Sequence, residues 1–136
     1  MRYLLDTNIV IYLVTGQDIS KDVLYILEDY GNLFYISSLS FVELKHLYEA
    51  KKIKTKYKSF EQMCKTILEE SNLIVLHTKD EHLATYTKLS IVEEKTDLID
   101  RFIISQAITE KMPLISSDRA FENYTPQKLK FVYNKR

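Results

Sequence analysis

The chain has 136 residues, enough for one domain that buries roughly two thirds of its unfolded surface, so we expect residues 1–136 to form a single domain. Hydrophobic residues make up 46% and charged residues 28%, which argues against intrinsic disorder. Nineteen basic and nineteen acidic side chains give a formal net charge of zero, so overall charge does not indicate a nucleic-acid partner.

Short apolar runs alternate with amphipathic segments along the chain. In order, we predict a strand (3–5), two helices (9–14, 19–30), a strand (33–36), two helices (40–50, 60–70), a strand (73–76), two helices (80–89, 97–111), a strand (114–116), a short turn (119–122) and a last strand (130–133). Gly31-Asn32 and Met112-Pro113 supply stop signals for the helices that precede them. Strands separated by such helices predict a three-layer α/β/α fold around a central, mostly parallel sheet of about five strands.

Several features bear on the compartment and on excluded functions. The lone Cys64 lies in an apolar helical stripe and cannot form an intrachain disulfide, which suits a reducing cytosol. Asp6 and Asn8 interrupt the first apolar run, and no stretch approaches the ~20 apolar residues of a membrane span, so we expect a soluble cytoplasmic protein. Two glycines cannot build a glycine-rich phosphate loop, which excludes P-loop and Rossmann nucleotide sites.

Four acidic residues are placed where they can meet. Asp6 and Asp118 each follow a predicted strand, Glu43 lies near the start of a helix that follows a strand, and Asp100 begins an apolar helix. Because the carboxyl ends of parallel strands form one edge of a sheet, acids scattered along the chain converge there. The sequence therefore predicts a carboxylate cluster at this edge.

Each acid also has a structural interpretation. Asp6 and Asp118 are suitable N-caps for the segments that follow them. Asp97 and Asp100 have the spacing of a capping box, which favours Asp97 as a helix cap over a metal ligand. Glu43 interrupts an apolar stretch, where a solvated acid is not expected. The four acids together are more informative than any one of them.

Converging carboxylates require a cation. Two carboxylates ~4 Å apart repel by about 4 kcal/mol at an effective dielectric near 20, and protonation or a divalent ion must relieve this repulsion. An all-oxygen site favours Mg²⁺, with Mn²⁺ as a substitute. His46, His77 and His82 lack zinc-ligand spacing. The chemistry that fits is hydrolysis of a phosphodiester by metal-activated water.

A second charged feature is the lysine-rich segment between residues 45 and 58, which contains six lysines and one acid, Glu49. It is either a solvated helix end and loop or a contact for a phosphate backbone, with Lys51, Lys52 and Lys54 as the candidate contacts for such a backbone.

Four blocks in this order resemble the PIN-domain ribonucleases, and within them the VapC-like toxins of prokaryotic type II toxin–antitoxin pairs. The resemblance spans nearly the whole chain and rests on residues 4–8 (LLDTN), 36–44 (ISSLSFVEL), 97–107 (DLIDRFIISQA) and 114–121 (LISSDRAF). No single block is specific, but the four together are.

The resemblance implies roles for individual residues. Asp6, Glu43, Asp100 and Asp118 match the acidic residues of the family, which implies a Mg²⁺-dependent endoribonuclease. We expect Asp6 and Asp100 to hold the metal directly with Asp118 close by, while Glu43 binds through water or orients the nucleophile. Asp97, which matches an extra acid of one subgroup, and Ser116, which matches a hydroxyl two residues before the last acid, are candidate accessory residues.

The chain departs from that subgroup at four positions, where Lys95, Leu98, Ile99 and Ser105 replace a His, Pro, Phe and Ala that are common there; these leave every acid intact. The resemblance also implies a homodimer and a small antitoxin seated in an apolar groove. Apolar side chains that either line this groove or simply belong to the core are Phe41, Leu44, Leu47 and Tyr48.

Three alternatives remain open at this stage. A stand-alone RNA-processing PIN nuclease would have no antitoxin, and a non-catalytic PIN-like module would bind no metal. A haloacid-dehalogenase-like phosphatase would need a second Asp two residues after the first, where this chain has Asn8.

Overall fold

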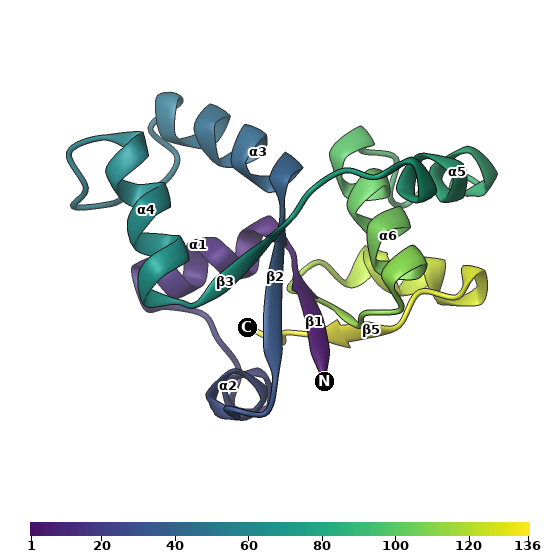
Figure 1. Cartoon of the computed structure of the whole chain (residues 1–136), viewed down its shortest axis with the longest axis horizontal. Helices are drawn as coiled ribbons and strands as arrows, with labels where there is room; N and C mark the ends of the chain where they lie inside the picture. Colours follow the sequence, from purple (N-terminus) through teal and green to yellow (C-terminus); the bar gives the residue numbers. More distant parts are fainter.

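The computed structural model describes residues 1–136, and its five strands and seven helices follow the predicted order (Figure 1). The elements are β1 (Arg2–Leu5), α1 (Thr7–Thr15), α2 (Lys21–Glu28), β2 (Leu33–Ser37), α3 (Ser38–Glu49), α4 (Phe60–Glu70), β3 (Leu73–Leu76), α5 (Asp80–Lys88), α6 (Leu98–Glu110), β4 (Leu114–Ser116), the 3₁₀ helix η1 (Arg119–Gln127) and β5 (Phe131–Tyr133). The turn expected at 119–122 was predicted too short, because the fully buried rings of Phe121 and Tyr124 hold η1 against the core through Gln127.

The strands form one parallel sheet in the order β3-β2-β1-β4-β5, which confirms the three-layer α/β/α prediction. From β1 the chain moves to β2 and β3 on one side, then returns to pair β4 with the other side of β1. The strand order therefore reverses between β1 and β4. In open parallel sheets, the crevice at the carboxyl ends of such strands is where ligands bind.

Alternating side chains divide the interior into two cores, one on each face of the sheet. Leu5, Ile36 and Ile115 pack with helices α1 to α4, whereas Leu4 and Leu114 pack with α6 and η1, and α5 packs against α6. Figure 1 shows these two groups of helices on opposite sides of the strands. The period of two along each strand explains why short, almost wholly apolar runs form the centre of the fold.

Helix α6 is the most buried helix, since every side chain from Phe102 to Ala107 is inaccessible to solvent or nearly so. Asp97 caps its first turn by accepting a hydrogen bond from the backbone N–H of Asp100 at 3.0 Å. At its other end, Glu110 accepts a 2.8 Å hydrogen bond from Nε2 of the fully buried His82 in α5. These contacts fix both ends of the helix that carries Asp100.

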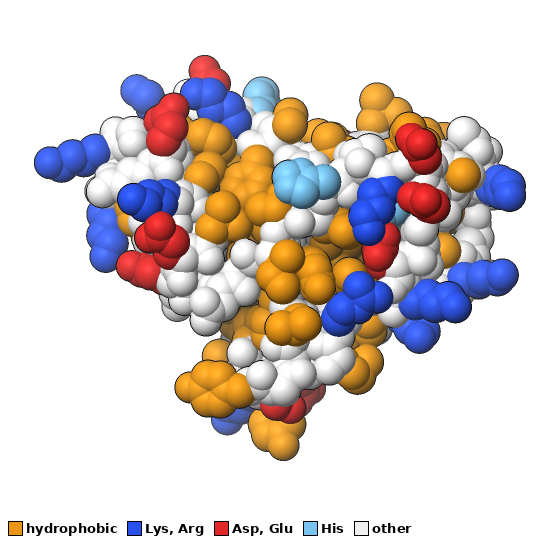
Figure 2. Space-filling model, viewed as in Figure 1, with side chains coloured by type: hydrophobic (Ala, Val, Ile, Leu, Met, Phe, Trp, Pro, Cys, Tyr) orange, Lys and Arg blue, Asp and Glu red, His pale blue; other side chains and the backbone are white.

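The surface combines charged margins with exposed apolar side chains. On the face seen in Figure 2, Lys and Arg side chains extend from the edges, and hydrophobic side chains occupy much of the area between them. Exposed large apolar residues of the chain include Tyr25, Tyr30, Leu33 and Ile74. None of the helices has both the length and the apolar character needed to cross a membrane.

Candidate active site

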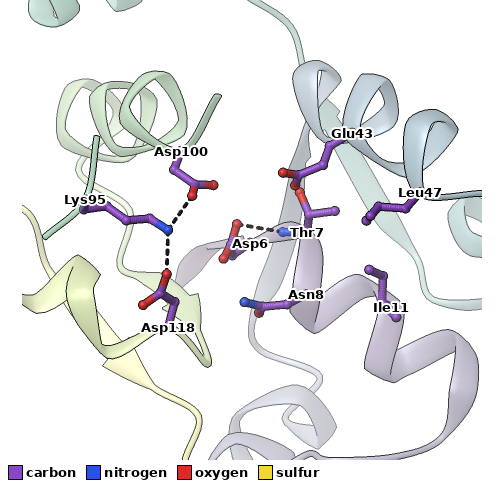
Figure 3. Close-up of a pocket in the computed structure, with 9 residues that line it drawn as sticks. All are labelled: Asp6, Thr7, Asn8, Ile11, Glu43, Leu47, Lys95, Asp100 and Asp118. Carbon is purple, nitrogen blue, oxygen red and sulfur yellow. Dashed lines mark hydrogen bonds and ion pairs between the residues drawn. The ribbon is translucent and has the colours of Figure 1, made fainter. Parts of the chain in front are cut away.

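The acidic residues surround a pocket of about 190 Å³ at the carboxyl edge of the sheet, beside the point where the strand order reverses (Figure 3). Asp6 comes from the end of β1, Glu43 from α3, Asp100 from α6, and Asp118 from the turn after β4. The residues that line the pocket are Asp6, Thr7, Asn8, Ile11, Glu43, Leu47, Lys95, Asp100 and Asp118. Residues from both ends of the chain thus meet in one cavity.

Asp6 is the most buried of the four acids, with only 4% of its surface exposed. Its two carboxylate oxygens accept hydrogen bonds from the backbone N–H of Thr7 at 2.8 Å and from the Ser116 hydroxyl at 2.7 Å. Burial and the nearby charge of Asp100 nevertheless raise the pKa of Asp6 to about 7. The side chain is held in place, but its ionised form is not fully stabilised by the protein alone.

The hydroxyl of Ser116 connects the ends of β1 and β4. While it donates to Asp6, it accepts hydrogen bonds from the backbone N–H of Asp118 at 3.0 Å and from Nδ2 of Asn8 at 3.3 Å. Asn8 completes the link by accepting a hydrogen bond from the backbone N–H of Ser117 through Oδ1. One buried hydroxyl therefore sets the positions of two acids.

We expect Ser116→Ala to lower the free energy of unfolding by about 1–3 kcal/mol, because it leaves a buried carboxylate oxygen and a backbone N–H without a partner. Urea denaturation measures this loss. The matched control is Ser105→Ala, whose buried hydroxyl only donates to the carbonyl of Arg101 within α6. Equal losses in the two variants would contradict the role assigned to Ser116.

Lys95 lies between the other two acids on the β4 side of the pocket. Its Nζ is 2.5 Å from a carboxylate oxygen of Asp100 and 2.5 Å from one of Asp118. Burial raises the pKa of Asp100 above its usual value, and the hydrogen bond from Lys95 offsets this only in part. For Asp118, partial burial also favours the neutral acid, but hydrogen bonds from Lys95 and the N–H of Ala120 hold its pKa below the usual value.

Glu43 reaches the pocket from the opposite side (Figure 3) and forms no hydrogen bond or ion pair in the structure. One oxygen of Glu43, one of Asp97 and one of Asp100 lie within 4.8 Å of one another. Asp97 is thus both the helix cap that the sequence favoured and a neighbour of the cluster, although it does not line the pocket. Glu43 is the acid whose oxygens are most available to a ligand.

The structure brings together the four acids that the sequence singled out, and their local capping contacts coexist with that arrangement. The sequence analysis named Lys95 only as a departure from a subgroup and Asn8 only as part of a matching block and as the residue that argues against a phosphatase, and it assigned neither to the site. The sequence provides little indication of the role of Lys95, because this residue lies in a loop whose path no periodic pattern defines. Of the apolar groove candidates, Leu44 is core, Leu47 lines the pocket, and Phe41 and Tyr48 pack partly against the core.

Comparison with known proteins identifies the family. The family model described as "PIN domain" matches residues 3–125. No curated protein matches the chain in sequence.

The fold is shared by chains from solved VapBC structures of several bacteria. One is VapBC2 from Rickettsia felis bound to a promoter DNA fragment, with 22% identity, a TM-score of 0.71 and 98% of each chain covered. VapBC-1 from nontypeable Haemophilus influenzae has 21% identity, a TM-score of 0.69 and 100% of each chain covered. DNA-bound VapBC from Salmonella typhimurium has 18% identity, a TM-score of 0.70 and 98% of each chain covered. The family match over most of the chain, together with this fold, shows that the protein belongs to the PIN domain family.

Proposed function

We propose that the protein is a Mg²⁺-dependent endoribonuclease that acts in the cytoplasm as the toxin of a toxin–antitoxin pair. The observation that carries this proposal is the convergence of Asp6, Glu43, Asp100 and Asp118 from four separate segments on one open pocket. A group of acids this close, in which burial raises the pKa of Asp6 and of Asp100, is suited to hold a cation.

The donor set fits a hard divalent ion. All the acidic ligands are oxygens, and no histidine or cysteine lines the pocket. One oxygen each of Glu43, Asp97 and Asp100 lies within 4.8 Å of the others, near the about 4.2 Å that separates opposite ligands of Mg²⁺, and Asp100 belongs both to this group and to the proposed ligands. We assign Asp6, Asp100 and Asp118 as the metal ligands, with Asp97 and Ser116 in accessory positions.

When bound, Mg²⁺ or Mn²⁺ would lower the pKa of water and stabilise negative charge on the scissile phosphate. The protein supplies the fixed geometry for this chemistry. Ser116 and the N–H of Thr7 hold the Asp6 carboxylate, while Asp100 and Asp118 reach the pocket from the other side of β1. The unpaired carboxylate of Glu43 orients the attacking water and accepts its proton.

We propose that the exposed lysines Lys51, Lys52 and Lys54 contact the RNA backbone. They lie in the loop between α3 and α4. Lys54 lines a second pocket with Val14 and Thr15 from the end of α1. Helix α1 begins beside Asp6, so its nine residues place this loop about 13 Å from the acids along the helix. That distance spans a few nucleotides of a single strand.

Replacing Lys51, Lys52 and Lys54 together by Ala should weaken RNA binding by roughly tenfold at physiological salt. The slope of log affinity against log salt should fall by about 2, because each lost phosphate contact on a single strand contributes about 0.7. Fluorescence anisotropy at several salt concentrations measures both quantities. The control replaces the exposed Lys21, Lys88 and Lys130, which lie outside the α3–α4 loop and should leave the slope unchanged.

The toxin assignment rests on the VapBC structures that share this fold. We propose a homodimer and a small antitoxin partner that contacts partly buried apolar side chains at the pocket, including Leu47. A neighbouring reading frame that encodes a short DNA-binding protein supports this assignment. If its absence is established, a stand-alone RNA-processing nuclease is the better description.

Cleavage of a panel of structured RNAs by the purified protein tests the enzymatic proposal. We expect cleavage with Mg²⁺ or Mn²⁺ and none with excess EDTA, because the carboxylates alone provide no Lewis acid to polarise the phosphate. Restoration of cleavage when Mg²⁺ is added back excludes damage by the chelator. A protein that binds neither metal nor RNA would overturn the proposal, and the absence of metal binding would favour a non-catalytic PIN-like module.

A further inference from the structure

Lys95 already occupies a cation position within the acidic pocket. Its ammonium is 2.5 Å from Asp100, on α6, and 2.5 Å from Asp118, beyond β4 (Figure 3). The side chains of Lys95 and Asp100 are each only 13% exposed, whereas that of Asp118 is 39% exposed. Two carboxylates from separate elements therefore share one largely buried positive charge.

The backbone around Lys95 is fixed, so the ammonium is placed by the fold and not by chance at the surface. The buried Tyr124 donates a 2.7 Å hydrogen bond from its hydroxyl to the carbonyl of Lys95 and accepts one from the N–H of Val92. Val92 and Lys95 also form an isolated β-bridge. The centroid of the Phe121 ring lies 4.8 Å from Nζ, which favours the cation further.

A lysine side chain is ordinarily a cation at neutral pH, and the Lys95 ammonium is in direct contact with both carboxylates. It uses carboxylate lone pairs that a divalent ion at the same place would need, and two cations within a few ångströms of each other repel strongly.

We propose that Lys95 is a tethered competitor of the divalent ion: its ammonium fills the cation position between Asp100 and Asp118 until the metal displaces it. The inference rests on the proposed function, because it assumes that these acids bind a metal. In this proposal Lys95 sets the metal concentration at which the site becomes occupied. Since only its side chain has to rotate, the loop can keep its hydrogen bonds during the exchange.

Mn²⁺ binding to metal-stripped protein, measured by electron paramagnetic resonance, tests this inference. We expect Lys95→Met to bind Mn²⁺ about 10- to 100-fold more tightly than the wild type, because no ammonium has to leave. The control is Lys79→Met, which removes an equal charge from a lysine paired with Glu110 at the far end of α6 and should leave the affinity unchanged. Equal or weaker binding by Lys95→Met overturns the inference alone, whereas no binding by either protein overturns the proposed metal site.

A second measurement uses the wild type and does not depend on a variant that folds. Side-chain ¹⁵N signals of the lysine ammonium groups are followed while Mg²⁺ is added, with backbone amides of the pocket residues as reporters of metal binding. We expect the Lys95 signal to shift or broaden together with the amide of Asp100, while that of Lys79 stays constant. A shift of the Asp100 amide signal without any change in the Lys95 ammonium signal contradicts displacement. The absence of a shift in every pocket amide signal contradicts metal binding itself.

Discussion

Asp6→Asn is expected to reduce RNA cleavage by roughly a thousandfold or more, the equivalent of about 4 kcal/mol in the activation barrier. The amide keeps the size of the side chain, and its oxygen still accepts the hydrogen bond from the N–H of Thr7. It loses the negative charge at the most buried acid of the pocket. Initial rates with saturating Mg²⁺ measure the loss, and calorimetry should show weaker metal binding in parallel.

The control for this variant is Asp22→Asn, which makes the same chemical change at an exposed residue in the first turn of α2. It should cleave RNA at the wild-type rate. Circular dichroism establishes that both variants fold. Retention of activity by a folded Asp6→Asn protein, especially activity that also survives EDTA, would show that Asp6 is not a metal ligand and that the acids do not act as proposed.

The contribution of Asp6 to the stability of the metal-free protein should fall as the pH rises from about 4 to about 7. The pKa of Asp6 is raised from 3.8 to about 7 on folding, so in this window the folded state binds more protons than the unfolded state. Stability decreases with pH under that condition, and a shift of this size corresponds to at most about 4 kcal/mol at pH 8. Asp100, whose pKa is also raised by burial, contributes in the same direction.

Urea denaturation of the wild type and Asp6→Asn in EDTA isolates this effect. The variant should gain stability relative to the wild type as the pH rises, with little difference near pH 4 and the largest difference above pH 7. Saturating Mg²⁺ should reverse the order, because only the wild type binds the ion tightly and is stabilised by it. A difference between the two proteins that does not change with pH would exclude a raised pKa for Asp6.

Much of the fold follows from local patterns in the sequence. The strands at 73–76 and 114–116 and the helix at 60–70 have the predicted bounds, because apolar runs with clear stop signals specify them. The 3₁₀ helix was underestimated, since its length depends on the burial of Phe121 and Tyr124 against distant parts of the chain. Contacts of that kind leave no periodic signal in the local sequence.

The residues of the candidate site also differ in how far the sequence alone predicts their positions. Asp6 and Asp118 could be predicted because each follows a strand, and parallel strands end at one edge. The position of Lys95 could not, because it depends on a loop held by Tyr124 and not on an element with a defined register. The raised pKa of Asp6 also required the three-dimensional arrangement, because local sequence encodes neither the burial of Asp6 nor its distance from Asp100.

The central position of β1 also affects when the acidic site can form during synthesis. β1 is the first strand of this sheet to be synthesised, yet one of its two neighbours is β4, which follows it by more than 100 residues. Ser116 and Asp118 reach Asp6 only when β4 has paired with β1. Because chains emerge from the N-terminus, a nascent polypeptide with β1, β2 and β3 complete still lacks half of the acidic site. The proposed metal site is therefore incomplete until most of this sheet has been synthesised.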